Sequence, residues 1–323
     1  MMRRCAVALC TVLSAAPVVA QQEAYPAKPI RLIVPSPPGA SNDGIARIVA
    51  NGINQSLGRP IVVDNRAGGG GIIASELVAR ARPDGYTLLL AYAAFTTTPF
   101  LQANMPYDVL KDFAPITEIA NQPLFLVVNT AIPVNSVKEL VALAKSRAGG
   151  LMAGYTQSGS STHLATEIFK LKTGTINTIT SVSYKGGAPV QVALMSGEVQ
   201  LSFATATSTL PQINSGRIRV IATSAAKRLS YAPEVPTLAE EGVLNLDAAP
   251  WQGLLAPAGT PHVIVARIHA EIVRLLKLKE SQERLAALGA DPVGSTPEEF
   301  RSKLATELQE FGRIIPALGL KRQ

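Results

Sequence analysis

The segment Ile30–Gly44, IRLIVPSPPGASNDG, decides the fold. Its apolar start, Ile30–Val34, predicts a buried strand, and the proline-rich run Pro35–Pro38 ends that strand. Beyond the segment, apolar residues recur at helical spacing and predict a helix that ends at Gly58. They are Ile45, Ile48, Val49, Ile53 and Leu57. A strand, a short polar loop and a helix in this order are typical of an α/β fold.

The same order repeats along the chain after this segment. Ile61–Val63 predicts the next strand, Gly68–Gly71 a tight turn into a helix, and Thr87–Leu90 a third strand. This β-α-β-α-β order favours a parallel sheet with helices on its faces. A second series begins at Leu124–Val128. Its further strands are predicted at Met152–Tyr155, Val182–Tyr184, Val199–Phe203, Ile218–Ala222 and Trp251–Ala256. Its helices are predicted over Thr162–Lys172 and Ala188–Ser196, after Thr207, and over His262–Leu276 and Ser281–Leu288. Capping boxes at Ser136-Val137-Lys138-Glu139 and Thr296-Pro297-Glu298-Glu299 predict two more helices, the first through Lys145.

Composition fits two folded lobes of ordinary size. The chain has 323 residues, of which 47% are hydrophobic and 16% charged, and this balance excludes disorder of the whole chain. The formal charge is +7, and no Lys/Arg block with interleaved aromatic residues occurs. We therefore expect no nucleic-acid partner.

The first twenty residues have the layout of a secretory signal peptide. A basic start with Arg3 and Arg4 precedes an apolar stretch, and Val18-Val19-Ala20 offers a cleavage site. A membrane anchor is the alternative, but the stretch is shorter than the roughly 20 residues that span a bilayer. Cys10 as a lipoprotein cysteine is a further alternative. Cleavage after Ala20 would remove both cysteines and two positive charges, which takes +7 to +5, and would place the protein in the periplasm without thiol chemistry.

Four short polar loops between a predicted strand and a predicted helix are the candidate binding elements. They are Pro37–Asp43, Gln157–Thr162, Lys185–Gly187 and Ala204–Ser208. Ligands of open α/β sheets lie beyond the carboxyl ends of the strands. A helix N-terminus there carries unpaired N–H groups and a partial positive charge, so several such ends together would bind a carboxylate. The bland alternative is that these residues are ordinary helix caps.

Three single residues keep two interpretations each. Asp43 either contacts the ligand or complements the helix dipole. His163 either packs under its loop or contacts the ligand. Trp251, the one tryptophan, either walls a cleft or fills a core.

Patterns of enzymes and metal sites are weak in this chain. Ser158 or Ser160 with His163 lacks a G-x-S-x-G elbow and a defined acid partner. The glycine run Gly68–Gly71 lacks the spacing of a phosphate-binding loop. His262 and His269 do not form an H-E-x-x-H pair. We therefore expect no catalytic residue, no metal and no cofactor.

The order of several short motifs resembles a known receptor family. The motifs are Val62–Gly70, Ala81–Leu88, Pro106-Tyr107-Asp108 with Lys111-Asp112-Phe113, Ser160–Ala165, Tyr184–Pro189, Val235–Glu240 and Ala256–Pro261. Together they make the chain, from about Tyr25 to Phe311, similar to the extracytoplasmic solute receptors of tripartite tricarboxylate transporters, also called Bug receptors.

The resemblance implies a two-lobed periplasmic-binding-protein fold with two crossovers between the lobes. The first lobe would comprise residues 25–122 plus 247–323, and the second residues 123–246. A small organic acid would bind between the lobes, partly through water, and hinge closure would present the receptor to membrane permease subunits. The protein is expected to be a monomer. A sensory receptor of the same fold, or a secreted hydrolase that uses Ser158 or Ser160, is an alternative function.

The resemblance also implies the ligand-binding residues. They are Pro37, Gly39, Ala40, Ser41, Asn42, Asp43, Tyr92, Thr96, Ser158, Gly159, Ser160, Ser161, Thr162, His163, Ala204 and Thr205. The chain departs from the family pattern at Pro38-Gly39-Ala40, where two adjacent glycines are frequent, and at Ala91–Thr96, which is less polar. Ala204-Thr205 stands where the family commonly has an acidic or amide residue. These departures suggest a less polar ligand, such as an aromatic or short monocarboxylic acid.

Overall fold

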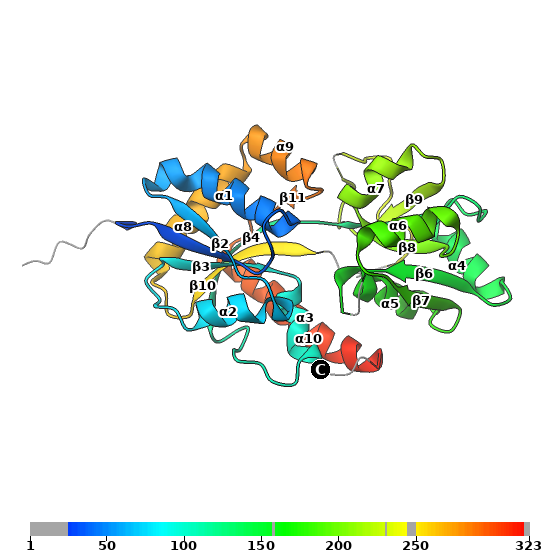
Figure 1. The fold of residues 1–323 in the computed structure, drawn as a ribbon, viewed down its shortest axis with the longest axis horizontal. Helices are drawn as coiled ribbons and strands as arrows, with labels where there is room; N and C mark the ends of the chain where they lie inside the picture. The colour runs from blue at the N-terminus through cyan, green and yellow to red at the C-terminus, as the bar shows by residue number, and fades with distance from the viewer. Residues whose placement is uncertain (1–24, 157–158, 230, 244–249, 320–323) are drawn as a thin grey trace, which may run out of the picture.

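Two lobes, each built on one β-sheet, lie side by side (Figure 1). The structure, a computed structural model, describes residues 25–156, 159–229, 231–243 and 250–319. The expected signal peptide and Ser158 lie outside these ranges. Within these ranges, no helix combines the length and the hydropathy that crossing a membrane requires.

The first sheet has the order β11-β4-β10-β3-β1-β2. Its strands are β1 (Ile30–Val34), β2 (Ile61–Asn65), β3 (Thr87–Tyr92), β4 (Phe113–Asn121), β10 (Trp251–Pro257) and β11 (Asp291–Pro292). β1 pairs in parallel with β2 and β3, which confirms the parallel unit expected from the sequence. β10 is antiparallel to both β3 and β4.

Helices cover both faces of this sheet. Packed on one face are α1 (Ser41–Leu57), α8 (His262–Leu276) and α9 (Lys279–Ala287), and on the other lie η1 (Gly69–Gly71), α2 (Ile72–Ala79), α3 (Ala94–Leu101) and α10 (Pro297–Ala317). Each face has its own apolar core, because alternate residues of a strand point to opposite faces. In β1, Leu32 belongs to one core and Ile33 to the other.

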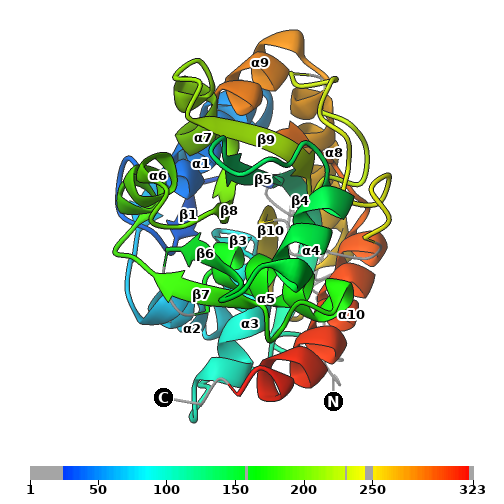
Figure 2. The ribbon, with the colours of Figure 1, turned by 90° about the vertical axis from the view of Figure 1, so that its right-hand side faces the viewer.

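The second lobe has a five-stranded sheet in the order β7-β6-β8-β5-β9. Its strands are β5 (Leu124–Asn129), β6 (Leu151–Tyr155), β7 (Ile179–Ser183), β8 (Leu201–Thr205) and β9 (Ile218–Thr223). Figure 2 views the molecule from this lobe. One core of the lobe includes residues of α4 (Val137–Ser146) and α5 (Ser161–Thr173), and the other includes residues of α6 (Gly187–Ser196) and α7 (Ala206–Ile213).

The C-terminal helix α10 contributes to both lobes. Phe300 and Leu304 pack in a core of the first lobe, whereas Phe311 and Ile315 pack in a core of the second. The chain itself crosses between the sheets twice, between β4 and β5 and between β9 and β10. The lobe boundaries at 122/123 and 246/247 stay predictions, and the second lies outside the described residues.

Both capping boxes expected from the sequence start a helix, but only one is complete. At α10 the Thr296 hydroxyl accepts from the Glu299 amide, and the Glu299 carboxylate accepts from the Thr296 amide. At α4 the Ser136 hydroxyl caps Glu139, but the Glu139 carboxylate accepts from the Asn135 amide. A complete box at Ser136 would have the Ser136 amide donate to Glu139. That part of the prediction is wrong, because the Asn135 amide donates instead.

Candidate functional site

The loop after β1 presents its tip to solvent and is held from below by Asp43. Pro37, Pro38 and Gly39 are exposed, whereas Asp43 is 3% exposed. The Asp43 carboxylate accepts from the Gly39 amide (2.9 Å), from Arg47 Nε (2.9 Å) and from Asn65 Nδ2 (3.0 Å). Burial alone would raise the pKa of Asp43, but these hydrogen bonds outweigh it and lower that pKa. Asp43 therefore holds the backbone of the loop at Gly39 and ties it to Asn65.

Helix α1 begins behind this loop without a side-chain cap. Its N-cap residue is Ala40, so the first amides of the helix, from Ser41 on, receive no capping hydroxyl or carboxylate. An uncapped N-terminus at an exposed loop is a partial positive charge available to an anion.

Two buried glutamines hold the side chains at the start of α1. Gln122 Nε2 donates to Ser41 Oγ (2.6 Å) and to the Leu288 carbonyl (2.8 Å). Gln252 Nε2 donates to Asn42 Oδ1 (3.1 Å) and to Gln122 Oε1 (2.7 Å). Gln122 follows β4 and Gln252 belongs to β10, so both crossover strands anchor the start of α1. Neither glutamine could be identified from the sequence, because nothing in its local pattern separates it from other buried amides.

The residues after β3 are more enclosed than expected. Tyr92 is half-buried and packs against Gly71, and burial raises the pKa of its hydroxyl. Thr96 is 0% exposed, and its hydroxyl donates to Glu307 Oε2 (2.7 Å) on α10. Trp251 donates its indole N–H to the same oxygen (2.9 Å) and packs edge-on against Phe300, which settles its two interpretations in favour of the core. The stretch Ala91–Thr96, expected as a loop, instead ends β3 and begins helix α3 (Ala94–Leu101).

In the second lobe, three hydroxyl groups close the loop between β6 and α5 at its base. Thr156 Oγ1 lies 3.0 Å from both Ser160 Oγ and Thr162 Oγ1, which are themselves 3.1 Å apart. Ser160 Oγ also caps α5 by accepting from the His163 amide (3.2 Å). Ser161 is half-buried, and its hydroxyl makes no hydrogen bond with the part of the chain that the structure describes. The Ser161 hydroxyl thus differs from those of Thr156, Ser160 and Thr162, which bond one another.

His163 packs under this loop, as one of its two interpretations had it. The ring is 5% exposed, stacks on Tyr155 with 4.1 Å between ring centroids, and accepts from the Gly159 amide at Nδ1 (3.1 Å). Burial, with a further contribution from Lys170, lowers the pKa of His163, whereas Glu167 opposes this change. The ring is therefore neutral near pH 7.

Unlike α5, the second-lobe helices α6 and α7 begin without side-chain caps. Helix α7 follows Thr205, whose hydroxyl lies near Thr207 and Ser208, while Ala204 is buried. Helix α6 follows Gly186, which has a φ of 102° that favours glycine. Both starts add backbone N–H groups and no charged side chain to the second lobe's candidate loops, except for the exposed Lys185.

Besides the contacts of α10, the described residues of the two lobes approach each other at two of the candidate loops. A Cβ atom on Gly159 would lie 2.6 Å from Leu101 at the end of α3. A Cβ atom on Gly289, after α9, would lie 2.9 Å from Ala206, the first residue of α7. Gly289 follows Leu288, whose carbonyl binds Gln122 beside Ser41. The starts of α1 and α7 are therefore linked through one short turn.

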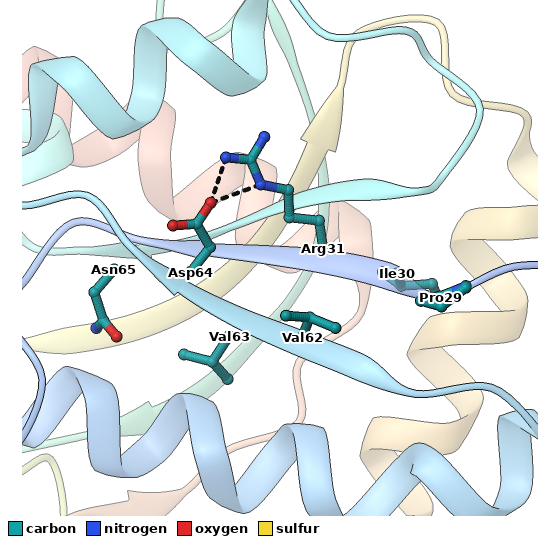
Figure 3. Close-up of a pocket in the computed structure, with 7 residues that line it drawn as sticks. All are labelled: Pro29, Ile30, Arg31, Val62, Val63, Asp64 and Asn65. Atoms are coloured by element: carbon teal, nitrogen blue, oxygen red, sulfur yellow. Dashed lines mark hydrogen bonds and ion pairs between the residues drawn. The ribbon is translucent and has the colours of Figure 1, made fainter.

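A separate groove lies along β1 and β2, at the edge of the first sheet (Figure 3). The Asp64 carboxylate there is held by Arg31 and Arg66, whose charges, together with their hydrogen bonds, lower its pKa against the effect of burial. Asn65 at the end of the groove donates to Asp43 and to the Ser36 carbonyl (2.9 Å). The groove thus lies behind the first loop and supports it.

The chain is similar to solute receptors over nearly its full length. The family described as "Tripartite tricarboxylate transporter family receptor" matches residues 45–320. Protein BugT of Bordetella pertussis is 39% identical over 95% of this chain and 94% of its own. The structure of R. palustris Rpa4515 with adipate superposes with a TM-score of 0.75 at 33% identity, over 93% of this chain and 100% of that one. That of the periplasmic binding protein BugD gives 0.71 at 31%, again over 93% and 100%.

Proposed function

Because the chain belongs to the tripartite tricarboxylate transporter receptor family, we propose that it captures one small organic acid between its lobes and delivers that acid to the permease subunits of such a transporter. The family comparison confirms the expected two-lobed periplasmic-binding-protein fold and a periplasmic solute receptor. The identity of the acid, the permease partner and a monomeric state belong to the proposal.

One observation carries the choice of a carboxylate. Helices α1, α6 and α7 all begin at candidate loops without a side-chain cap. Free backbone N–H groups and the helix dipole attract an anion, and together they can replace a cationic side chain. Rpa4515, a protein of the same fold, holds adipate, a dicarboxylate. The Ser161 hydroxyl and the α1 start would then supply the first contacts to the carboxylate.

The loops also favour a ligand of low charge. Among their described residues Lys185 is the single cation, and Asp43 is already neutralised by Arg47. Ala204 and Thr205 offer no charged group to a distal amine or carboxylate. We propose a mono- or dicarboxylic acid with an apolar body.

A thermal-shift screen checks this class of ligand. Short aliphatic and aromatic monocarboxylates, adipate, and citrate as a tricarboxylate are added to the purified protein. A ligand that binds only the folded state raises Tm by mass action. We expect mono- or dicarboxylates to raise Tm. An exclusive response to citrate would contradict the low-charge ligand, and no response to any carboxylate would contradict the carboxylate receptor.

The serine residues of the second lobe support binding without catalysis. Ser160 Oγ caps α5, and His163 Nδ1 accepts from the Gly159 amide, so within the described residues neither group meets the other as nucleophile and base. We therefore propose that the protein is not an enzyme. Hydrolysis of an ester that disappears in Ser160→Ala or Ser158→Ala would contradict this.

Ser161→Ala is expected to weaken binding of the acid found in the screen and to leave the fold intact. Loss of a hydrogen bond to a charged group costs about 1.5–3 kcal/mol, or less where water substitutes, which corresponds to a rise in Kd of roughly 10- to 150-fold. Calorimetry measures Kd. Ser146→Ala, at an exposed position far from the loops, is the control, and an unchanged Kd in Ser161→Ala would remove Ser161 from the site.

A further inference from the structure

A buried polar row runs from the second-lobe loop into the lobe interior. On α5, His163, Glu167 and Lys170 follow one another at helical spacing, and they are 5%, 8% and 6% exposed. His163 Nε2 lies 4.0 Å from Glu167 Oε1, and Lys170 Nζ bonds both Glu167 oxygens and Ser181 Oγ on β7. Groups of this kind are costly to bury, so their retention next to a binding loop calls for a reason.

The ring of His163 is fixed from three sides. Tyr155 on β6 stacks against its face, Glu167 lies beyond Nε2, and the Gly159 amide donates to Nδ1. Since Nδ1 accepts a hydrogen bond, the ring proton must be on Nε2, on the side of the Glu167 carboxylate. The carboxylate therefore favours the tautomer that can hold Gly159.

Gly159 is the point where this ring acts on the loop. Its φ of 75° lies in the left-handed region, and it is followed directly by Ser160, the cap of α5, and by Ser161. The hydroxyl triangle of Thr156, Ser160 and Thr162 fixes the base of the loop but does not reach the Gly159 amide. The bond to His163 is the contact that orients the Gly159 amide within the described residues.

We propose that His163 is the positioning residue of the second-lobe binding loop: its neutral ring holds Gly159 through Nδ1, and this presents the Ser161 hydroxyl and the α5 N-terminus to the acid. The expected effect on affinity rests on the proposed function. The hydrogen bond between the Gly159 amide and His163 does not depend on it. His163 itself does not touch the ligand.

A dependence on pH follows from this bond. Protonation of the ring places a proton on Nδ1, which then faces the Gly159 N–H donor to donor, and the bond is lost. Burial and Lys170 lower the pKa of His163 below its ordinary 6.5, and Glu167 opposes them. The loop is therefore held above pH 6.5 and is released as the pH falls below that value through the lowered pKa.

Three variants separate the acceptor from the ring. In His163→Asn, Oδ1 takes the place of Nδ1 and keeps an acceptor that does not titrate in this range. In His163→Phe, an aromatic ring can still stack on Tyr155 but cannot accept. In His163→Gln, the amide reaches the place of Nε2 and not that of Nδ1. Tm of each variant is measured first, so that affinities are compared only among folded proteins.

The first measurement needs no ligand. The protein is labelled with ¹⁵N-glycine, and the Gly159 amide signal is assigned by its loss in Gly159→Ala. We expect this signal to titrate with a midpoint below pH 6.5 in the wild type and not in His163→Asn. Amide exchange at neutral pH should be slow in both of these proteins and faster in His163→Phe and His163→Gln. The same titration in His163→Asn, or equal exchange in all four proteins, would overturn the proposal.

The second measurement is the Kd of adipate, with the acid that gives the largest shift in the screen as a second probe. At neutral pH we expect His163→Asn to bind within about threefold of the wild type and His163→Phe at least about tenfold more weakly. Below pH 6.5 the wild type should lose affinity relative to His163→Asn. Equal Kd values in the Asn and Phe variants would overturn the positioning role. If no acid binds the wild type, the proposed function fails and the Gly159 amide still decides this inference.

Discussion

Lys170→Met is expected to lower the free energy of unfolding by about 3–5 kcal/mol, because it removes one partner of a buried ion pair. Lys170 Nζ lies 2.9 and 3.0 Å from the two Glu167 oxygens, and both residues are buried, at 6% and 8% exposed. The remaining carboxylate would keep Ser181 as a neighbour but would lose its cation. A buried charge without a counter-charge is among the largest single causes of destabilisation.

Urea unfolding at neutral pH measures this loss, and two further variants serve as controls. Lys172→Met changes an exposed lysine of the same helix and should shift stability by less than about 0.5 kcal/mol. The double variant Glu167→Leu with Lys170→Met removes both charges and should recover much of the loss, as buried pairs replaced by apolar residues often do. A Lys170→Met protein as stable as Lys172→Met would contradict the buried pair.

Strands with continuous apolar runs could be predicted from the sequence, whereas interrupted ones could not. The run Ile30–Val34 forms β1 as expected, with its parallel neighbours β2 and β3. Strand β4 was missed, because Pro115 and Glu118 interrupt it. In the structure Pro115 lies at a shift in register against β10, where a proline is tolerated, and Glu118 is paired with Lys303. The register shift and the ion pair both depend on residues that are distant in the sequence, so neither leaves a local signal.

Helix α3 was missed for a similar reason. Its sequence, AFTTTPFL, holds three threonines and a proline, which are poor helix formers. Burial of Phe95 and the three threonines against neighbouring elements overrides that preference. The opposite case is α10, whose start was predicted by its capping box and by the proline at its first helical position.

Some features of the candidate site could likewise be predicted from the sequence, and others could not. Helix starts after strands could be predicted from local pattern, and the structure brings the starts of α1 and α7 close to one turn, Leu288–Gly289. The partners of single side chains could not, because they come from distant segments. Thr96 meets Glu307, 211 residues away, and Ser41 meets Gln122. One such residue does leave a signal in the sequence: Glu307 falls on the apolar stripe of its helix, which predicts that it is buried.

This stripe is the basis of the second large effect. The buried positions of α10 are Phe300, Leu304, Glu307, Phe311 and Ile315. The first two pack in the first lobe and the last two in the second. Glu307 thus lies where the helix passes from one core to the other, and its Oε2 accepts from Thr96 and Trp251. These bonds join α3, β10 and α10 at the junction of the lobes.

Glu307→Leu is expected to destabilise the protein by roughly 2–4 kcal/mol. It leaves the buried indole N–H of Trp251 without an acceptor, and it removes one of two acceptors of the Thr96 hydroxyl, which keeps the Ala93 carbonyl (3.1 Å). Glu307→Gln keeps an acceptor oxygen of the same reach and should lose less than half as much. Urea unfolding followed by tryptophan fluorescence suits this test, since Trp251 is the one tryptophan and donates to Glu307. Equal losses in the two variants would show that the charge of the carboxylate, which both variants lack, and not its acceptor oxygen, stabilises the junction.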